Sequence, residues 1–255
     1  MDHTLLVGLS RQTALRRELD IVSNNIANLN TTGFKADGAV FAEYLQTGAQ
    51  AGQFATPDRR LSFVQDRTTW TDMSPGPLQR TGNALDLAIE GNAFFVVQTE
   101  QGERFTRNGA LQINATGELV TSAGHRVLGE SGPITFNSTD RDVTINPDGS
   151  IRVREGIKPT DAARGKLRLV AFADPRQLRK DGASTFTAPE GMQPQPATDA
   201  RVVQGALEKS NVRSVIEMTR MIELTRSYTE VANILQKQSD MRKSAIDRLA
   251  EVPAA

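Results

Sequence analysis

The sequence predicts an α+β fold in which an N-terminal and a C-terminal helix form one discontinuous, coiled-coil-like helical layer, with an all-β central domain inserted between them. Three observations lead to this prediction. Apolar residues recur at helical spacing near both ends, short apolar runs alternate with turn signals between them, and neither glycine nor proline occurs from Asn211 to Val252. The 255 residues are enough to bury a core in one or two domains.

The composition excludes several classes of function. Thirty basic and thirty acidic side chains cancel, which argues against broad electrostatic binding to nucleic acid or to an anionic membrane. Without cysteine the chain has no disulfide, no thiolate zinc site and no cysteine nucleophile. No apolar run approaches the roughly 20 residues that a spanning helix needs, so we expect a chain that is not membrane-inserted. The stretch Leu5–Leu9 is too short for a signal peptide and lacks a basic segment before it, so no cleaved signal peptide is expected.

A heptad pattern predicts the first helix, from about Thr4 to Asn30. Two adjacent rows of residues at seven-residue spacing run along it, and Gly8 and Gln12 are their exceptions to apolar character. The apolar members are Leu5, Leu15, Leu19, Val22, Ile26 and Leu29. Gly33 follows, and glycine readily adopts the left-handed conformation in which helices end.

The middle of the chain changes from an irregular connector to a β pattern. Residues 35–80 contain many glycines and prolines, and we interpret them as a connector with short strands at Leu61–Val64 and Arg67–Trp70. From residue 81 to about 200, turn signals separate short apolar runs, which predicts an all-β domain. The expected strands are residues 85–89, 94–98, 104–106, 111–113, 119–121, 126–128, 143–145, 150–153 and 166–172. Asn108–Gly109 is the strongest hairpin signal among the turns.

A second helix is predicted after the β domain, because apolar residues again follow three-and-four spacing. The predicted division is residues 1–34 for the N-terminal helix of a helical core, 35–80 for the connector, 81–200 for the central β domain and 201–255 for the C-terminal helix. Each helix presents a single apolar stripe. We therefore expect the two helices to pack on each other or on the same helices of neighbouring subunits.

Three parts of the chain resemble the flagellar rod and hook family. They are Gly8–Ser10 with Val22–Lys35, Gly91–Val97 with Phe105–Gly109, and Gly205–Val212. They lie near both ends and inside the β region, in the order that the family has. Within the family the chain is most similar to proximal-rod members, by Met1–His3, Gly132–Ile134 and Met218–Glu223. Distal-rod members of similar length are the alternative.

This resemblance implies a structural subunit of the bacterial flagellar basal-body rod, and no enzyme. Such a subunit self-assembles into the helical drive shaft that transmits torque, with the terminal helices as the inner wall and the β domain as an outer layer. The implied partners are the chain itself, neighbouring proximal and distal rod proteins, and the flagellar type III export apparatus. No cofactor, metal or small-molecule substrate is implied. The implied location is the periplasmic rod of the basal body, reached without signal-peptide cleavage.

The assembly interface expected from this resemblance lies on both helices. On the first helix it comprises Leu5, Leu15, Leu19, Val22, Asn24, Asn25, Ile26, Asn28, Leu29 and Asn30. On the second it comprises Met218, Met221, Ile222, Leu224, Tyr228, Val231 and Leu235. The asparagines either bridge the backbones of neighbouring subunits or simply end a helix and begin a turn. The methionines fit an adaptable partner surface or ordinary core filling.

The sequence offers little to catalysis. Its only histidines are His3 and His125, and no H-x-x-x-H metal pair is present. Gly165–Lys166 lacks the surrounding residues of a phosphate-binding loop. Two other classes remain as alternatives. A different extracellular filament module would not explain the N-terminal segment, and a β-domain hydrolase with paired carboxylates has no residue constellation behind it.

Overall fold

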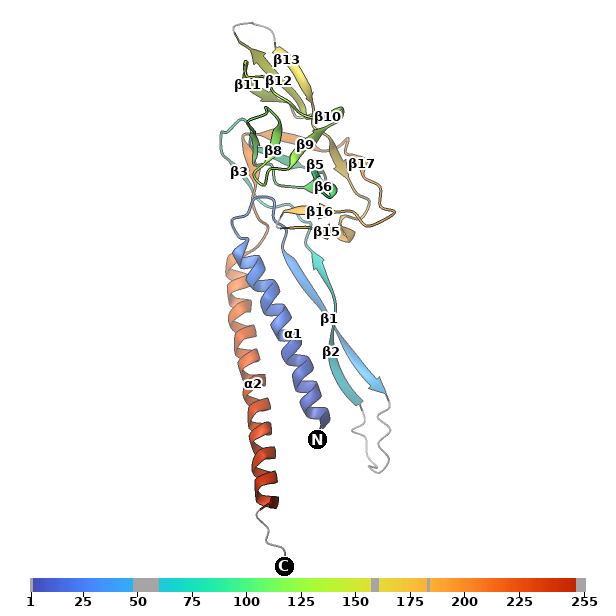
Figure 1. Ribbon diagram of the computed structural model, residues 1–255, viewed down its shortest axis with the longest axis vertical. Helices are drawn as coiled ribbons and strands as arrows, with labels where there is room; N and C mark the ends of the chain where they lie inside the picture. The colour runs from blue at the N-terminus through green and yellow to red at the C-terminus, as the bar shows by residue number, and fades with distance from the viewer. Residues whose placement is uncertain (1, 48–59, 157–160, 183, 251–255) are drawn as a thin grey trace, which may run out of the picture. The chain divides into compact units, whose positions relative to one another are not determined.

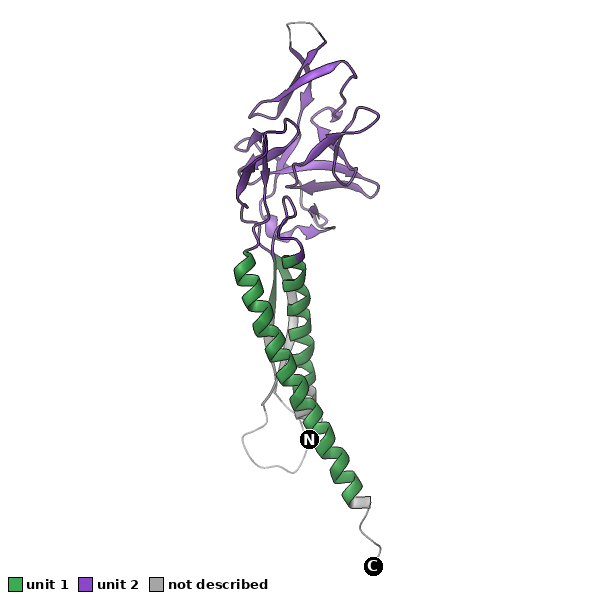
Figure 2. Ribbon diagram, turned by 90° about the vertical axis from the view of Figure 1, so that its left-hand side faces the viewer, with its two compact units in different colours: residues 1–26, 37–70, 213–255 green, residues 27–36, 71–212 purple. Residues whose placement is uncertain are grey.

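The computed structural model describes residues 2–47, 60–156, 161–182 and 184–250. The fold is α+β, as the sequence predicts. The chain forms two compact units, coloured separately in Figure 2. Unit 1 comprises residues 1–26, 37–70 and 213–255, and unit 2 comprises residues 27–36 and 71–212. No helix in the described part of the chain is both long enough and apolar enough to cross a membrane.

Unit 1 contains the two long helices, α1 (Asp2–Ala27) and α2 (Ser214–Ala250). They lie side by side in both views (Figures 1 and 2). They run antiparallel, because Gly8 faces Leu235 whereas Glu18 forms an ion pair with Arg220. A Cβ atom on Gly8 would lie 2.7 Å from the Leu235 side chain, so the missing side chain lets the helices approach closely here.

The helix pair buries a small apolar seam. Leu15, Val22 and Leu224 are its fully buried members, and four partly buried side chains pack around them: Leu19, Ile26, Tyr228 and Val231. Their spacing is the three-and-four repeat of helices that meet along one stripe. Each helix therefore covers one apolar stripe of its partner, and several large apolar side chains of α2 outside this stripe are exposed.

The predicted connector contains more regular structure than the sequence indicates. Instead of two short strands, unit 1 has the long strands β1 (Asp37–Thr47) and β2 (Arg60–Thr71), paired as a two-stranded sheet. A Cβ atom on Gly38 would lie 2.5 Å from the Trp70 indole nitrogen, so the indole lies directly against this glycine. Packing of this kind between residues far apart in sequence leaves no periodic signal in either segment.

Unit 2 is built from β strands joined by tight turns. Its largest sheet has the order β15–β16–β6–β5–β9–β8–β7, with β10 on β9, and with β14 between β5 and β17. Separate small sheets are β11–β12–β13, β18–β4 and β19–β3. The strands are β3 (Leu78–Arg80), β4 (Leu87–Glu90), β5 (Phe94–Thr99), β6 (Gly102–Thr106), β7 (Leu111–Ile113), β8 (Leu119–Thr121), β9 (Arg126–Gly129), β10 (Gly132–Pro133), β11 (Asp140–Ile145), β12 (Ser150–Glu155), β13 (Asp161–Lys166), β14 (Leu169–Ala171), β15 (Arg179–Lys180), β16 (Thr185–Thr187), β17 (Gln195–Pro196), β18 (Arg201–Gln204) and β19 (Ala206–Glu208). A short 3-10 helix, Pro175–Gln177, precedes β15.

Strand β5 carries the core of unit 2 on both of its faces. Phe95 and Val97 point into one apolar cluster, and Phe94 and Val96 into another. In the second cluster the ring of Phe94 meets those of Phe172 and Phe186 edge to face, at 5.9 and 5.8 Å between centroids. A strand buried on both faces explains why residues 94–97 are a continuous apolar run rather than an alternating one.

Two predictions about the strands are wrong, one about pairing and one about the extent of a strand. Asn108–Gly109 does not form a hairpin, because β6 pairs with β5 and β16 while β7 pairs with β8. Gly109 instead lies beside the start of β4, where its carbonyl oxygen accepts from the Leu87 amide at 2.9 Å, and a Cβ atom on it would lie 1.7 Å from the Leu87 carbonyl oxygen. The expected strand 166–172 is divided into β13 and β14, because Leu167 and Arg168 donate their amides to Gly149 and Leu128 instead.

The end of the β region also differs from the expected pattern. Residues 201–208 form β18 and β19, which pair with β4 and β3, and α2 begins only at Ser214. Gly205 lies between these strands with φ +75°, a left-handed conformation that lets the chain turn from one small sheet into the next.

Candidate functional site

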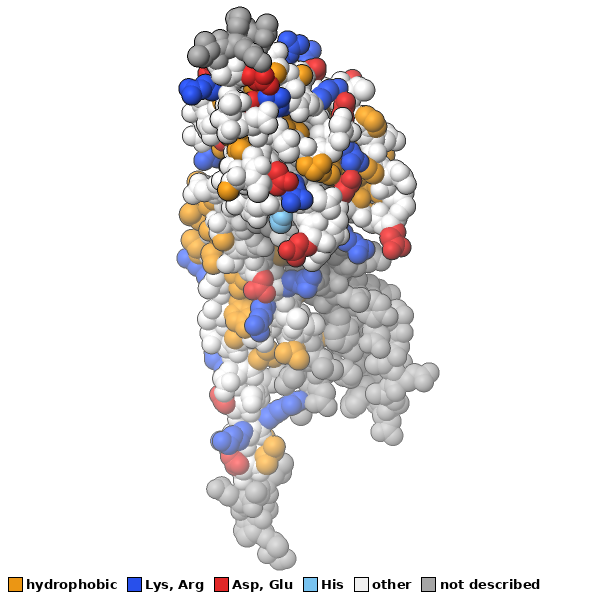
Figure 3. All heavy atoms as spheres, turned by 45° about the horizontal axis from the view of Figure 1, so that its top comes forward, with side chains coloured by type: hydrophobic (Ala, Val, Ile, Leu, Met, Phe, Trp, Pro, Cys, Tyr) orange, Lys and Arg blue, Asp and Glu red, His pale blue; other side chains and the backbone are white. Residues whose placement is uncertain are grey.

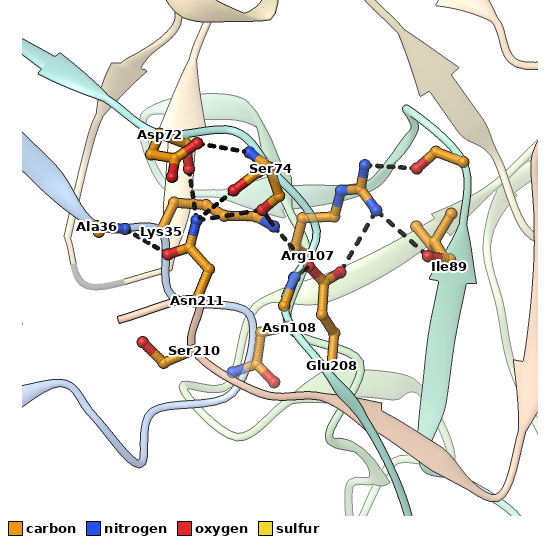
Figure 4. A network of polar contacts seen from close by, with 12 residues as sticks. Lys35, Ala36, Asp72, Ser74, Ile89, Arg107, Asn108, Glu208, Ser210 and Asn211 are labelled. Atoms are coloured by element: carbon orange, nitrogen blue, oxygen red, sulfur yellow. Dashed lines mark hydrogen bonds and ion pairs between the residues drawn. The ribbon is translucent and has the colours of Figure 1, made fainter. Parts of the chain in front are cut away.

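A cluster of buried charges lies in unit 2, where three distant segments of the chain meet (Figure 4). The carboxylate of Glu208, at the end of β19, accepts a hydrogen bond from Lys35 Nζ at 2.5 Å. Its other oxygen lies 3.4 Å from Nη1 of Arg107. The side chains of Lys35 and Glu208 are each 1% exposed and that of Arg107 is 3% exposed. Because all three are removed from water, each needs its partners.

Local backbone geometry brings Lys35 to this place. Gly33 has φ +68°, and a Cβ atom on it would lie 2.5 Å from the carbonyl carbon of Arg107. Its amide donates to the backbone oxygen of Glu208 at 2.8 Å. Only glycine combines this conformation with such a close approach, so Gly33 brings the segment 33–36 against the end of β6.

Backbone groups complete the coordination of the charges. The amide of Gly76 donates to Glu208 Oε1 at 2.9 Å, and Lys35 Nζ also donates to the carbonyl oxygen of Ser74. The Arg107 guanidinium donates to the carbonyl oxygens of Ile89 and Gly91. The Arg107 contacts come from β4 and the turn after it, whereas the Lys35 and Glu208 contacts come from the chain that enters and leaves the β region.

Asn211 extends the network in the same region, as Figure 4 shows. Its Oδ1 accepts from the Ala36 amide at 2.8 Å, and its Nδ2 donates to the carbonyl oxygens of Asp72 and Ser74. One carboxamide from the C-terminal part of the chain thus bridges the backbones of two N-terminal segments, at residue 36 and at residues 72–74.

The cluster contains two cations and one anion. Burial lowers the pKa of Lys35, although the Glu208 carboxylate opposes this change, and burial likewise lowers the pKa of Arg107. The Arg107 guanidinium also lies 5.1 Å from the centre of the Phe94 ring. Its Nε has no acceptor among the described residues. Glu208 is therefore the one carboxylate that both buried cations share.

The arrangement suits a structural role better than a chemical one. The described residues contain no group of three side chains able to hold a metal ion. A surface hollow of about 620 Å³ is lined by polar residues, but its Arg104 is already paired with Asp181 at 2.5 Å. On the face in Figure 3, acidic and basic side chains are interspersed over unit 2.

The expected interface residues of the first helix divide between the two units. Leu15, Leu19, Val22 and Ile26 belong to the seam of unit 1, whereas Leu29 and Asn30 lie in unit 2. The side chain of Leu5 lies outside the described residues.

The asparagines of this helix differ in their surroundings. Asn25 is buried and exchanges two hydrogen bonds with the backbone of Asp37, at 2.9 and 3.0 Å, within unit 1. Asn28 accepts from the Thr31 hydroxyl in unit 2 at 3.0 Å, while Asn24 is exposed. Asn25 and Asn28 thus both have partners inside their own chain, and Asn25 is the one of the two that is buried.

The expected residues of α2 fall on different faces. Leu224, Tyr228 and Val231 pack in the seam, and Leu235 is half-buried against Gly8. Met218, Met221 and Ile222 are exposed. The structure therefore brings the first group together with α1 and leaves the second group without cover in unit 1.

Sequence reasoning did not assign a role to the charged cluster. Lys35, Arg107 and Glu208 all occur in segments that carry the family resemblance, yet nothing local marks them as buried. The available signal is weak: Lys35 follows Gly33–Phe34 and Arg107 follows Phe105, whereas Glu208 follows Ala206–Leu207 and precedes a second charge, Lys209. The partners lie 101 and 173 residues from Glu208, which no periodicity can reveal.

Known families match this chain in three places. Residues 5–35 match "Flagella basal body rod protein", residues 88–153 match "Flagellar hook protein FlgE/F/G D1 domain", and residues 203–248 match "Flagellar basal body rod FlgEFG protein C-terminal". Each charged member of the cluster lies inside a different one of these three matches.

Full-length relatives agree with these matches. The flagellar basal-body rod protein FlgF of Caulobacter vibrioides is 41% identical, over 99% of this chain and 100% of its own length. FlgF of Mesorhizobium japonicum is 33% identical over 98% of each chain, and FlgG of Bacillus subtilis is 29% identical over 97% of this chain and 99% of its own. The chain belongs to the flagellar basal-body rod protein family, a family of structural proteins rather than enzymes, and within it resembles the FlgF members more than the FlgG members.

Proposed function

We propose that this chain is a proximal-rod subunit, in which α1 and α2 form a discontinuous, coiled-coil-like helical layer that packs on the helices of neighbouring subunits. In this proposal the helical layer is the inner wall of the drive shaft and the β domain is an outer layer. The neighbours are further copies of the chain and other proximal and distal rod proteins. A distal-rod role is the alternative, which the lower identity to FlgG relatives makes second.

The observation that carries this proposal is the apolar surface that α2 leaves uncovered. Val215, Met218 and Ile222 follow three-and-four spacing on one side of the helix, and Val215 is 75% exposed. Ile234 and Met241 are seven residues apart, and Ile234 is 62% exposed. These residues lie on faces that the seam with α1 does not use, as their positions relative to Leu224 on the helix require.

A helix that is apolar on several sides is stable when several neighbours surround it. Burying one large aliphatic side chain contributes about 1.5–3 kcal/mol, so a few such contacts per subunit hold a repeating assembly together. The exposed residues of α2 would supply these contacts when copies assemble. Apolar side chains are also visible along the helical part in Figure 3.

The test adds one negative charge to this uncovered surface. Ile234→Asp, expressed in a strain that lacks the gene, should abolish rods beyond their base in electron micrographs of basal bodies, and abolish swimming. Asn233→Asp adds the same charge at the neighbouring exposed position and should leave rods and swimming intact. Normal rods with Ile234→Asp would refute the proposed helix-to-helix assembly.

We further propose that the chain reaches the periplasm through the flagellar type III export apparatus, without removal of a signal peptide. The support for this is the family resemblance of the first 35 residues. Mass spectrometry of the subunit from purified basal bodies should find the N-terminal residues intact. A shortened N-terminus that begins at one defined residue would contradict this route.

The free monomer should also differ between its parts. We expect α1 and α2 to separate or unfold readily in the monomer, before neighbouring subunits bind, while the β domain stays folded. Limited proteolysis of the purified monomer should therefore cut α2 before it cuts strands β4–β9. Equal protection of both parts would contradict this expectation.

A further inference from the structure

The charged cluster of unit 2 is close, along the chain, to the residues at which the chain leaves this unit. The chain crosses from one unit to the other four times, at residues 26/27, 36/37, 70/71 and 212/213. Three of these crossings are within two residues of a member of the network: Ala36, Asp72 and Asn211. The network therefore fixes, inside unit 2, the segments by which the chain enters and leaves it.

The three charges are not equivalent in how they are held. Arg107 is bound by the carbonyl oxygens of Ile89 and Gly91, which belong to the β region itself. Lys35 has one backbone acceptor, Ser74, besides Glu208. Arg107 thus has backbone acceptors within the β region. Glu208 is the carboxylate that contacts both cations, whereas Asp72 acts on Lys35 through its charge. Without Glu208, docking the segment 33–36 would bury a second cation beside Arg107 with no anion between them.

Buried charges of this kind favour complete assembly over partial assembly. Removing one partner of a buried pair leaves an uncompensated charge, which costs far more than the pair itself contributes. Apolar side chains at the same positions would instead gain contacts gradually as segments approach. Close backbone contacts at glycines also favour complete assembly, because they form only when both segments are in place. A Cβ atom on Gly76, for example, would lie 1.9 Å from the Lys209 carbonyl oxygen.

We infer that Lys35, Arg107 and Glu208 form an electrostatic latch that makes docking of the segment 33–36 depend on docking of strand β19, so that unit 2 closes only when both of its ends are present. Since Glu208 follows Arg107 by 101 residues and Lys35 by 173, the latch is completed only when nearly all of unit 2 is available. If the chain is unfolded during the proposed export, the latch prevents unit 2 from closing before strand β19 is available. That consequence rests on the proposed function, whereas the latch itself does not.

The experiment measures amide hydrogen exchange in the purified full-length protein, in peptides that cover residues 31–36 and 206–211. Glu208→Gln should raise exchange at least 10-fold in both segments, because it leaves Lys35 and Arg107 buried together without an anion. Adding Lys35→Met should reverse most of this change, because Arg107 alone keeps its two backbone acceptors. Such rescue by a second substitution is the signature of the latch.

The exposed ion pair between Lys166 and Glu130 provides matched controls. Glu130→Gln and Lys166→Met make the same chemical changes and should leave exchange in residues 31–36 and 206–211 unchanged. An effect of Glu208→Gln confined to residues 206–211 would overturn the latch, as would a double variant that exchanges as fast as or faster than the single one. If Glu208→Gln does not fold, recovery of folded protein in the double variant supports the latch, and a double variant that also fails to fold overturns it.

Discussion

Unit 1 and unit 2 bury their apolar residues in very different ways. In unit 2, strand β5 is covered on both faces, and two apolar clusters are closed by strands from the whole region. In unit 1, the described seam has three fully buried members, while large apolar side chains of α2 remain exposed. Unit 2 thus encloses two apolar cores, whereas α2 of unit 1 leaves large apolar side chains exposed.

The two units also differ in how far their ion pairs are removed from water. Unit 2 buries Lys35, Arg107 and Glu208 completely, while the Glu18–Arg220 pair of unit 1 lies partly in water. Partly exposed pairs contribute little to stability. The charge pair of unit 1 therefore guides helix register at most, whereas the cluster of unit 2 determines whether distant segments can dock.

The largest expected effect comes from placing a charge in the seam of unit 1. Leu19→Asp or Leu235→Asp should abolish rod assembly and swimming, because a carboxylate cannot be buried between apolar helices without a partner. Unit 2 should keep its stability, since neither residue belongs to its clusters. Swimming assays, together with a denaturant titration of the purified variants, test both parts. Normal swimming by either variant would mean that the seam tolerates a charge, and would contradict its role in rod assembly.

The next largest effect is expected from a cavity in the core of unit 2. Phe95→Ala removes a ring that is fully buried in the larger cluster, and should destabilise unit 2 by about 3–5 kcal/mol. Leu224→Ala in the seam of unit 1 should leave the unfolding of unit 2 unchanged. Urea titrations followed by hydrogen exchange in strands β5 and β9 measure both variants. Equal losses in unit 2 would mean that the two units fold as one.

A smaller effect is expected at Gly33. Gly33→Ala should cost about 1–2 kcal/mol for the left-handed backbone and about 1–3 kcal/mol more for the contact with Arg107. Gly124 is the matched control, because it has φ +85° but nothing within 4 Å of the position of a Cβ atom. Gly124→Ala should therefore cost only the backbone contribution. The difference between the two urea midpoints isolates the close approach, and equal midpoints would contradict it.

The sequence predicts best those elements whose signals come from residues close together in the chain. Strands β5, β7, β8, β9 and β12 lie at or within a few residues of their predicted positions, because apolar runs and turn residues such as Gly124 and Gly149 are local signals. The hairpin predicted at Asn108–Gly109 failed because the same dipeptide also suits a close backbone contact with Leu87. Local chemistry specified the glycine there, but only tertiary packing decided its use.

The candidate site shows the same limit. The segments that contain Lys35, Arg107 and Glu208 were recognisable from the family resemblance, and the seam residues Leu15, Val22 and Leu224 from helical spacing. The buried contacts among the three charges could not be predicted, since a lysine or glutamate in isolation indicates solvent exposure. Their burial depends on partners from three different parts of the chain.

The smallest expected effect concerns the sheet β11–β12–β13, which is a peripheral part of unit 2. Hydrogen bonds from Arg164, at 2.7 and 2.6 Å, and from the Asn137 amide lower the pKa of Asp140 below its usual 3.8. Because the folded-state pKa is the lower one, the ionised carboxylate stabilises the sheet above about pH 4. This contribution is lost as the pH falls through the folded-state pKa. Glu155 shares Arg164 at 2.6 Å, so part of the network remains when Asp140 is neutralised.

Asp140→Asn tests this pH dependence. At pH 6 the variant should be less stable than the parent protein, and at pH 2.5 the difference should shrink, because below its usual pKa of 3.8 the unfolded parent is protonated at this position. Asp161→Asn removes an exposed carboxylate from the same sheet and should change stability little at either pH. Hydrogen exchange in β11 and β12 shows whether the loss stays local. A spread of the effect to β5 would instead mean that this sheet unfolds together with the central core of unit 2.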